Sequence, residues 1–177
     1  MKKCLCFFLA CLLILPLVGC ANEQKDLVKP VKYYYCKENI TYGPEGGVFD
    51  YEQRESHGYE DNTYYLISRY LRGPETNGLA QTFPNYTRLI RCYVEEDAVS
   101  LQISNEIAAL SGIELTKACV ALTMTVYGIT GIETVTIQAE SQLLDGKEAL
   151  TFRYSDFVYL DEAWLTPPVT TTKEPEE

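Results

Sequence analysis

The sequence predicts a small α/β (α+β) domain, a single two-layer sandwich in which helices cover one face of a sheet. In residues 87–94 and 99–104, apolar and polar side chains alternate, which is typical of strands with one buried face. Residues 115–127 repeat apolar residues at spacings of four, three and four, which places them on one side of a helix. With a β-rich run over 132–137, these patterns predict the order β-α-β-β-α-β with an extra C-terminal strand.

The first half of the chain supplies two strands and a helix. Residues 31–36 are apolar and aromatic and form the first strand, while residues 48–55 alternate between apolar and charged and form a possible edge strand. Asp61 or Asn62 can cap a helix over 63–71. The residues expected in the core from this helix and the connection after it are Tyr64, Ile67, Tyr70, Leu71, Leu79 and Phe83.

The second half supplies the hairpin and the long helix. In the hairpin, Ile90, Cys92 and Val94 share one face, and residues 95–98 close the turn, where a glycine would suit positive φ better than Ala98. The apolar stripe of the helix is Leu115, Cys119, Leu122 and Val126, and its end is expected before Gly128 and Gly131. A turn at Asp145-Gly146 then leads into a last strand over 150–160.

The ends of the chain predict a protein exported and held by a lipid. Two lysines precede a fifteen-residue apolar run over 4–18, shorter than the roughly 20 residues that a membrane-spanning helix needs. The run ends in Leu17-Val18-Gly19-Cys20, which resembles a bacterial lipobox. Residues 1–20 are therefore expected to be a lipoprotein signal peptide with Cys20 as the lipidated residue; the alternative is an ordinary signal peptide cut nearby. A tether over 21–29, a domain over 30–163 and a disordered tail over 164–177 complete the expected organisation.

Charge limits the classes of partner. The chain has a net charge of −10, and without residues 1–20 it keeps 13 basic and 25 acidic residues, a net charge of −12. Such a charge disfavours nucleic acid and electrostatic binding to an anionic membrane. Attachment to the membrane is therefore expected through the lipid on Cys20, with the domain outside the cytoplasm.

Neither the cysteines nor the histidine indicate a reactive centre. If Cys20 is acylated, Cys36, Cys92 and Cys119 remain, and we expect three free thiols, with a Cys36–Cys92 disulfide as the alternative. His57, the only histidine, lies among acidic residues and could serve a metal or acid–base site, but a solvated loop is the favoured interpretation. We expect no catalytic, cofactor or metal site.

Tyrosine is the unusual residue of this chain. Nine of the fourteen tyrosines lie between Tyr33 and Tyr70, and strand alternation places Tyr34 opposite to its two neighbours. Tyrosine offers apolar area with a polar tip, which suits interfaces and sugar stacking. The candidate interaction surface consists of Tyr34, Tyr42, Tyr51 and Tyr59; the alternative is that these rings only fill the core and its rim.

Three blocks of residues together carry a family resemblance. They are Leu71-Arg72-Gly73-Pro74 with Gly78-Leu79 and Phe83-Pro84; Leu89-Ile90, Val94-Glu95, Asp97-Ala98-Val99, Leu101 and Ile103; and Ala121-Leu122-Thr123 with 131–137. In this order they resemble the GerMN domain of sporulation and spore-germination lipoproteins. The resemblance covers about 31–140, and one departure is Ala98, where the family usually has glycine. It implies an α/β sandwich similar to the ring-building motifs of envelope assembly machines, without catalysis or cofactor.

Two functions of different class follow. The first is a lipid-anchored, non-catalytic cell-envelope protein that assembles with envelope or sporulation proteins, or with copies of itself, during sporulation or spore germination. The alternative is a module that binds a small ligand or a cell-wall glycan through the tyrosine-rich surface. An enzyme is not expected.

Overall fold

The computed structural model describes residues 30–40 and 47–156, and it confirms a small α+β domain. The elements are β1 (Pro30–Cys36), β2 (Phe49–Glu55), α2 (Thr63–Tyr70), β3 (Leu89–Val94), β4 (Ala98–Ile103), the 3-10 helix η2 (Asn105–Ala109), α3 (Gly112–Thr130), β5 (Thr134–Ala139) and β6 (Leu150–Arg153). The predicted signal peptide with Cys20, the tether over 21–29, Tyr42 and the tail over 164–177 lie outside the described residues.

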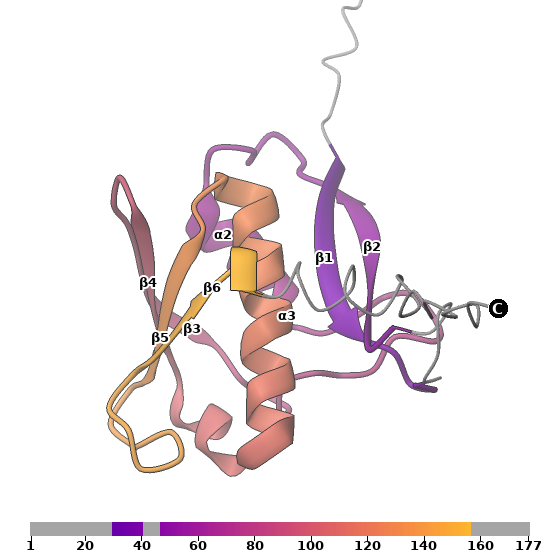
Figure 1. Ribbon diagram of the computed structural model, residues 1–177. Helices are drawn as coiled ribbons and strands as arrows, with labels where there is room; N and C mark the ends of the chain where they lie inside the picture. Colours follow the sequence, from indigo (N-terminus) through magenta and orange to yellow (C-terminus); the bar gives the residue numbers. More distant parts are fainter. Residues whose placement is uncertain (1–29, 41–46, 157–177) are drawn as a thin grey trace, which may run out of the picture.

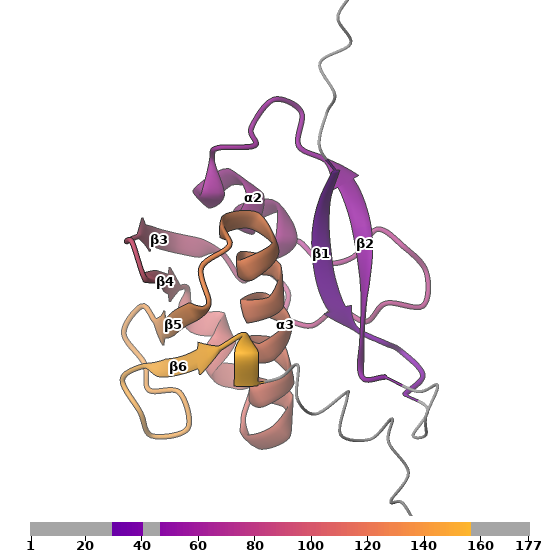
Figure 2. The same cartoon turned by 45° about the horizontal axis from the view of Figure 1, so that its top comes forward.

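Helices α2 and α3 lie between two separate sheets (Figures 1 and 2). The expected single sheet is therefore divided, because the first strand pairs with β2 and not with the hairpin. β1 and β2 run antiparallel in continuous register from Pro30 opposite Glu55 to Cys36 opposite Phe49. The other sheet has the order β3-β4-β5-β6.

The four-stranded sheet is built around a parallel pair. β4 and β5 are parallel, with Val99 opposite Val135 and Leu101 opposite Ile137, and α3 makes the connection between them. Both strands alternate between buried and partly exposed positions along their whole length, as the period of two predicts. β3 and β6 flank this pair in antiparallel orientation.

Helix α3 is buried on two sides because it contacts both sheets. The predicted stripe of Leu115, Cys119, Leu122 and Val126 is fully buried, as expected. Thr125 is buried as well, and its hydroxyl accepts a hydrogen bond from the Tyr34 backbone N–H at 2.9 Å. This bond ties the helix to the edge of β1 that β2 does not occupy.

The ends of α3 differ from the prediction. The helix begins at Gly112 and continues to Thr130, so Gly128 lies inside it and not past its end. Gly131 is the true stop: its φ of 72° is left-handed, and its N–H donates to the Tyr127 carbonyl. A glycine within a helix lowers its stability, and here packing on both sides compensates.

Helix α2 is confirmed, with one misplaced side chain. The Asn62 side chain caps it by accepting from the Tyr65 N–H at 2.9 Å. Ile67, Tyr70, Leu71, Leu79 and Phe83 are buried as predicted, and Leu66 is buried as well. Tyr64, predicted as core, is 47% exposed, and its hydroxyl donates to the Leu89 carbonyl at 3.0 Å.

The hairpin forms as predicted but with less burial along its first strand. The register shifts between Leu89 and Arg91, so Leu89 and not the predicted Ile90 is the buried residue at the start of the strand. Val94, at the other end, is 50% exposed. The connection has three residues, 95–97, because Ala98 already belongs to β4 and needs no positive φ. The last strand ends at Arg153, earlier than the predicted 160, and residues 157–160 lie outside the described part.

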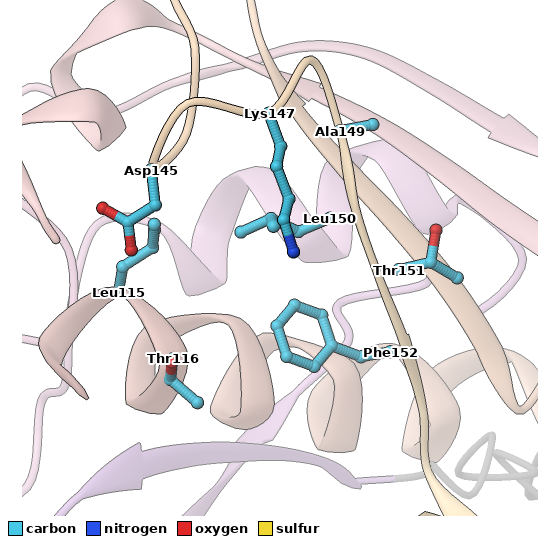
Figure 3. A pocket seen from close by; sticks show the side chains of 8 residues that line it. All are labelled: Leu115, Thr116, Asp145, Lys147, Ala149, Leu150, Thr151 and Phe152. Carbon is cyan, nitrogen blue, oxygen red and sulfur yellow. The ribbon is translucent and has the colours of Figure 1, made fainter. Parts of the chain in front are cut away.

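The Asp145-Gly146 turn is confirmed and also caps a helix. Leu144 and Lys147 exchange backbone hydrogen bonds of 2.8 and 3.0 Å, and both turn residues have positive φ, as a type I′ turn requires. An Asp145 carboxylate oxygen accepts from the Gly112 N–H at 2.8 Å, so it satisfies one free N–H of the first turn of α3. Figure 3 shows the Asp145 side chain beside Leu115 in this part of the helix.

We expect Gly128→Ala to raise the free energy of unfolding by about 0.5–1 kcal/mol, because alanine favours the helix and loses less chain entropy. The site is open, since a Cβ there meets only the Lys32 carbonyl oxygen, at 3.9 Å. Urea denaturation measures the change. Gly131→Ala is the matched control and should destabilise, because alanine is strained at that residue's φ of 72°. Equal effects of both substitutions would contradict the helix boundary.

We expect Asp145→Ala to destabilise the protein by about 1 kcal/mol, because it removes a carboxylate from the helix N-terminus. Asp145→Asn separates charge from hydrogen bonding, since asparagine tolerates the same backbone and can still accept from Gly112. Thermal denaturation measures both. An alanine variant as stable as the unmutated protein would show that the cap contributes nothing.

Candidate functional site

The β1–β2 hairpin carries tyrosines on both of its faces. Tyr33 and Tyr35 are buried against the helices. Tyr34 faces the other way, opposite Tyr51 in the register, and the two ring centroids lie 5.5 Å apart. Tyr51 is 43% exposed, with the Lys32 ammonium 4.5 Å from its ring centroid. The alternation predicted for residues 33–35 is therefore confirmed.

Two further tyrosines extend this aromatic group. Tyr127 near the end of α3 stacks on Tyr154 after β6, with ring centroids 3.8 Å apart and planes 9° apart. Burial raises the pKa of the Tyr34 hydroxyl, and repulsion from the ionised forms of the neighbouring Tyr154 and Tyr51 raises it further, as expected for side chains that lie close together. We name Tyr34, Tyr51, Tyr127 and Tyr154 the tyrosine surface. Sequence reasoning missed the last two because only the tertiary fold brings them to the hairpin.

Tyr59, the remaining candidate among the described residues, does not belong to this surface. It lies in the loop before α2, is 47% exposed, and its ring centroid is 4.2 Å from that of Tyr65. Tyr42 lies outside the described residues, so the structure brings together two of the four predicted surface residues.

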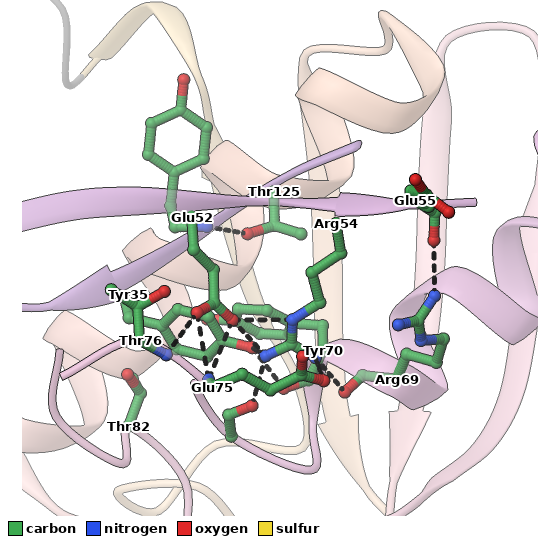
Figure 4. A network of polar contacts seen from close by, with 12 residues as sticks. Tyr35, Glu52, Arg54, Glu55, Arg69, Tyr70, Glu75, Thr76, Thr82 and Thr125 are labelled. Carbon is green, nitrogen blue, oxygen red and sulfur yellow. Dashed lines mark hydrogen bonds and ion pairs between the residues drawn. The ribbon is translucent and has the colours of Figure 1, made fainter. Parts of the chain in front are cut away.

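The inner face of the same hairpin contains a buried ion pair (Figure 4). Glu52 and Arg54 are both buried and form a salt bridge, with the Arg54 Nε donating to the Glu52 carboxylate at 2.7 Å. Arg54 also donates to the Gly73 carbonyl at 2.6 Å and to the Tyr35 hydroxyl at 3.2 Å. Tyr35 in turn donates to the Tyr70 carbonyl at 2.9 Å, so the pair holds the end of α2 against β2.

Glu52 organises the loop after α2. Its carboxylate accepts from the backbone N–H of Glu75 at 3.0 Å and of Thr76 at 2.8 Å. Burial alone would raise the pKa of Glu52, but hydrogen bonds from Thr76 and Arg54 outweigh it and hold this pKa below its ordinary value. Gly73 belongs to the same loop with a φ of 97°, and a Cβ there would collide with the Gln81 side chain.

The remaining candidates for chemistry have structural explanations. His57 is exposed in the loop before α2, 3.9 Å from the Glu55 carboxylate, which agrees with the solvated-loop interpretation. Cys36, Cys92 and Cys119 are free, so the predicted alternative of a Cys36–Cys92 disulfide is wrong. These two cysteines belong to different sheets. Burial raises the pKa of the Cys119 thiol to about 12, which keeps it protonated and unreactive.

A pocket of about 340 Å³ lies between the start of α3 and β6 (Figure 3). Leu115, Leu150 and Phe152 supply apolar walls, and Lys147 points its ammonium toward the Phe152 ring. Asp145 also lines this pocket, but its carboxylate caps α3. Among residues 30–40 and 47–156, no three His, Cys, Asp or Glu side chains are grouped to hold a metal ion, and no helix has the length and apolarity to cross a membrane.

We expect Glu52→Gln to lower the free energy of unfolding by about 3 kcal/mol, because the buried Arg54 guanidinium would lose its buried counter-charge. The folded-state pKa of Glu52 is lowered, so its ionised form adds stability above the unfolded-state value of about 4.3, and this stability is lost as the pH falls through the folded-state pKa. Urea denaturation from pH 7 to pH 3 should therefore show a weaker acid dependence in the variant. Glu55→Gln, on the exposed side of the same strand, is the control; an equal effect of the two substitutions would contradict the role of the buried pair.

Comparisons with known proteins point to one family. The family model described as "Germane: Sporulation and spore germination" matches residues 33–145. The tandem GerMN domains of the sporulation protein GerM from Bacillus subtilis match in structure with a TM-score of 0.51 and 17% identity, over 71% of this chain and 45% of that chain. This similarity concerns the fold alone. A comparison with curated protein sequences found no match.

Two further solved structures are more distant in shape. A Clostridium perfringens protein provisionally described as a lipoprotein has a TM-score of 0.46 and 22% identity, over 74% of this chain and 92% of that chain. The first GerMN domain of GerM alone gives a TM-score of 0.46 and 15% identity, over 71% and 96% of the two chains. With the family model covering more than half of its residues, this chain belongs to the Germane family of sporulation and spore-germination domains.

Proposed function

We propose that this chain is a lipid-anchored, non-catalytic protein of the cell envelope that assembles with protein partners in sporulation or spore germination. The tyrosine surface is the contact that it offers to them. The observation that carries this proposal is the convergence of four tyrosines from four separate segments of the chain, β1, β2, α3 and the turn after β6.

The chemistry of this surface fits a protein partner. Tyrosine buries large apolar area at low entropic cost and keeps a hydroxyl for hydrogen bonds, so it is enriched at interfaces. The Tyr34 and Tyr51 planes are tilted by 53°, and Lys32 occupies one face of Tyr51. A flat sugar ring would need an open aromatic face, so this arrangement favours a protein over a cell-wall glycan.

The non-catalytic part of the proposal rests on how the charged and nucleophilic groups are used. The buried Glu52 and Arg54 have their hydrogen-bonding groups engaged in holding the α2 loop. Cys119 is buried and protonated, and His57 is exposed in a loop. These groups therefore have structural roles or none, which supports an interaction protein.

The lipid anchor rests on the sequence. Cys20 follows the apolar run in a lipobox-like motif, and the strongly negative charge of the chain makes an electrostatic hold on an anionic membrane unfavourable. The proposed location is therefore outside the cytoplasm, on the cell membrane.

A photo-crosslinking amino acid at position 51 of the lipidated full chain tests the contact in cells. We expect adducts of discrete mass that contain a second protein, because this side chain is the most exposed member of the tyrosine surface. Position 86 is the matched control, since Tyr86 is 87% exposed but lies in the loop before β3. Equal adducts at both positions would contradict the proposal, and adducts removed by digestion of the cell wall would favour the glycan alternative.

Once the partner is identified, Tyr51→Ala should weaken binding by about tenfold or more, as truncation of an interface tyrosine does. The half-exposed Tyr51 contributes little to the core, so the thermal stability should change little. Isothermal titration and thermal denaturation of the same variant separate the two effects. A variant that binds as tightly as the unmutated protein would remove Tyr51 from the interface.

A further inference from the structure

The edge strand β3 presents unpaired backbone groups. Within the described sheet its neighbour is β4 alone. Glu95 donates its N–H to the Ala98 carbonyl at 2.9 Å, which identifies Glu95 and Ala98 as a hydrogen-bonded pair of the ladder. In an antiparallel ladder such pairs alternate with pairs whose backbone groups point outward. The N–H and C=O groups of Cys92 and Val94 therefore point away from β4, and no residue of the described part of the chain bonds to them.

An open pocket of about 590 Å³ runs along this same edge. Tyr59 and Asp61 from the loop before α2, Tyr64 from α2, and Cys92 and Val94 from β3 line it. Cys92 and Val94 are paired with Leu101 and Val99, so their side chains lie on the face of the sheet that α3 covers further along. The pocket accounts for the half-exposed Val94, because the helices do not cover this end of the strand.

The open part of the edge is short. The Tyr64 hydroxyl already occupies the Leu89 carbonyl, and the ladder shifts register between Leu89 and Arg91. Strand pairing is therefore available only from Arg91 to Val94, where outward backbone groups and the pocket coincide. This combination is the geometry of strand addition, in which backbone hydrogen bonds provide affinity and a pocket for alternate side chains provides specificity.

We propose that the edge of β3 binds an extended, positively charged segment of a partner protein by strand addition, with a basic side chain of that segment entering the pocket. The sign of the charge follows from the surroundings. Asp61 lines the pocket, no basic residue does so, and Glu95, Glu96 and Asp97 follow the strand directly. The sheet that carries β3 lies on the other side of the helices from the β1–β2 hairpin, so this site is separate from the tyrosine surface and is tested independently of it (Figures 1 and 2).

The test uses the full chain in detergent micelles and two matched seven-residue peptides, Thr-Val-Thr-Lys-Thr-Val-Thr and the same peptide with glutamate at its centre. We expect the lysine peptide to slow amide hydrogen exchange of Cys92 and Val94 by about tenfold or more, because their outward N–H groups become hydrogen-bonded, while exchange of Tyr93, which already bonds to β4, changes less. The glutamate peptide should bind at least about tenfold more weakly, because it would place a carboxylate beside Asp61.

Two variants separate backbone pairing from charge. Val94→Pro removes one outward N–H and leaves the ladder to β4 unchanged, since proline is tolerated at a free strand edge, and it should abolish binding of the lysine peptide. Val94→Ala keeps the N–H and is its control. Asp61→Lys leaves the backbone intact and should reverse the preference between the two peptides.

The proposal is wrong if exchange at Cys92 and Val94 is unaffected by either peptide, or if Val94→Pro and Asp61→Lys leave lysine-peptide binding unchanged. Analytical ultracentrifugation of the full chain without peptide provides the other decisive outcome. Concentration-dependent dimers in which Cys92 and Val94 are protected would assign this edge to a second copy of the chain and overturn the assignment to a basic partner.

Discussion

The two-sided burial of α3 is the interaction on which the rest of this structure depends. One side of the helix covers the alternating apolar faces of β4 and β5, and the other lies against β1. Because the helix touches both sheets, its buried surface extends well beyond a single stripe and includes the hydroxyl of Thr125. Burial of this extent explains how a helix rich in β-branched residues, with a glycine inside it, remains stable.

The Glu52–Arg54 pair completes the attachment of the hairpin to the helices. A buried ion pair adds little net stability by itself, because the cost of removing two charges from water offsets their attraction. Its contribution here is positional: Glu52 and Arg54 bond to backbone groups of Gly73, Glu75 and Thr76, and thereby fix the loop that ends α2. The same hairpin then presents Tyr34 and Tyr51 outward on a fixed support, which suits an interaction surface.

The sequence was most informative where one physical rule acted alone. β4 and β5 each have one buried face, so their period of two located them correctly, and Asn62 and Asp145-Gly146 were recognisable from local chemistry. The layering was not predictable, because in β2 the charged Glu52 and Arg54 point inward while Tyr51 points outward, the reverse of the usual pattern. Two of the four residues of the tyrosine surface, Tyr34 and Tyr51, were predicted from the sequence, and they are neighbours in the strand register. Tyr127 and Tyr154 were missed, because only the tertiary fold brings them close to the hairpin.

The short open stretch of β3 also bears on how the protein avoids uncontrolled polymerisation. Long, flat and unprotected edges template stacks of identical strands, which can grow into fibrils. Here the Tyr64 hydroxyl and the register shift after Leu89 interrupt the edge, and a cluster of carboxylates repels a second acidic chain at its other end. An edge of this length can pair with one added strand. It offers too little continuous backbone to template a growing stack of strands.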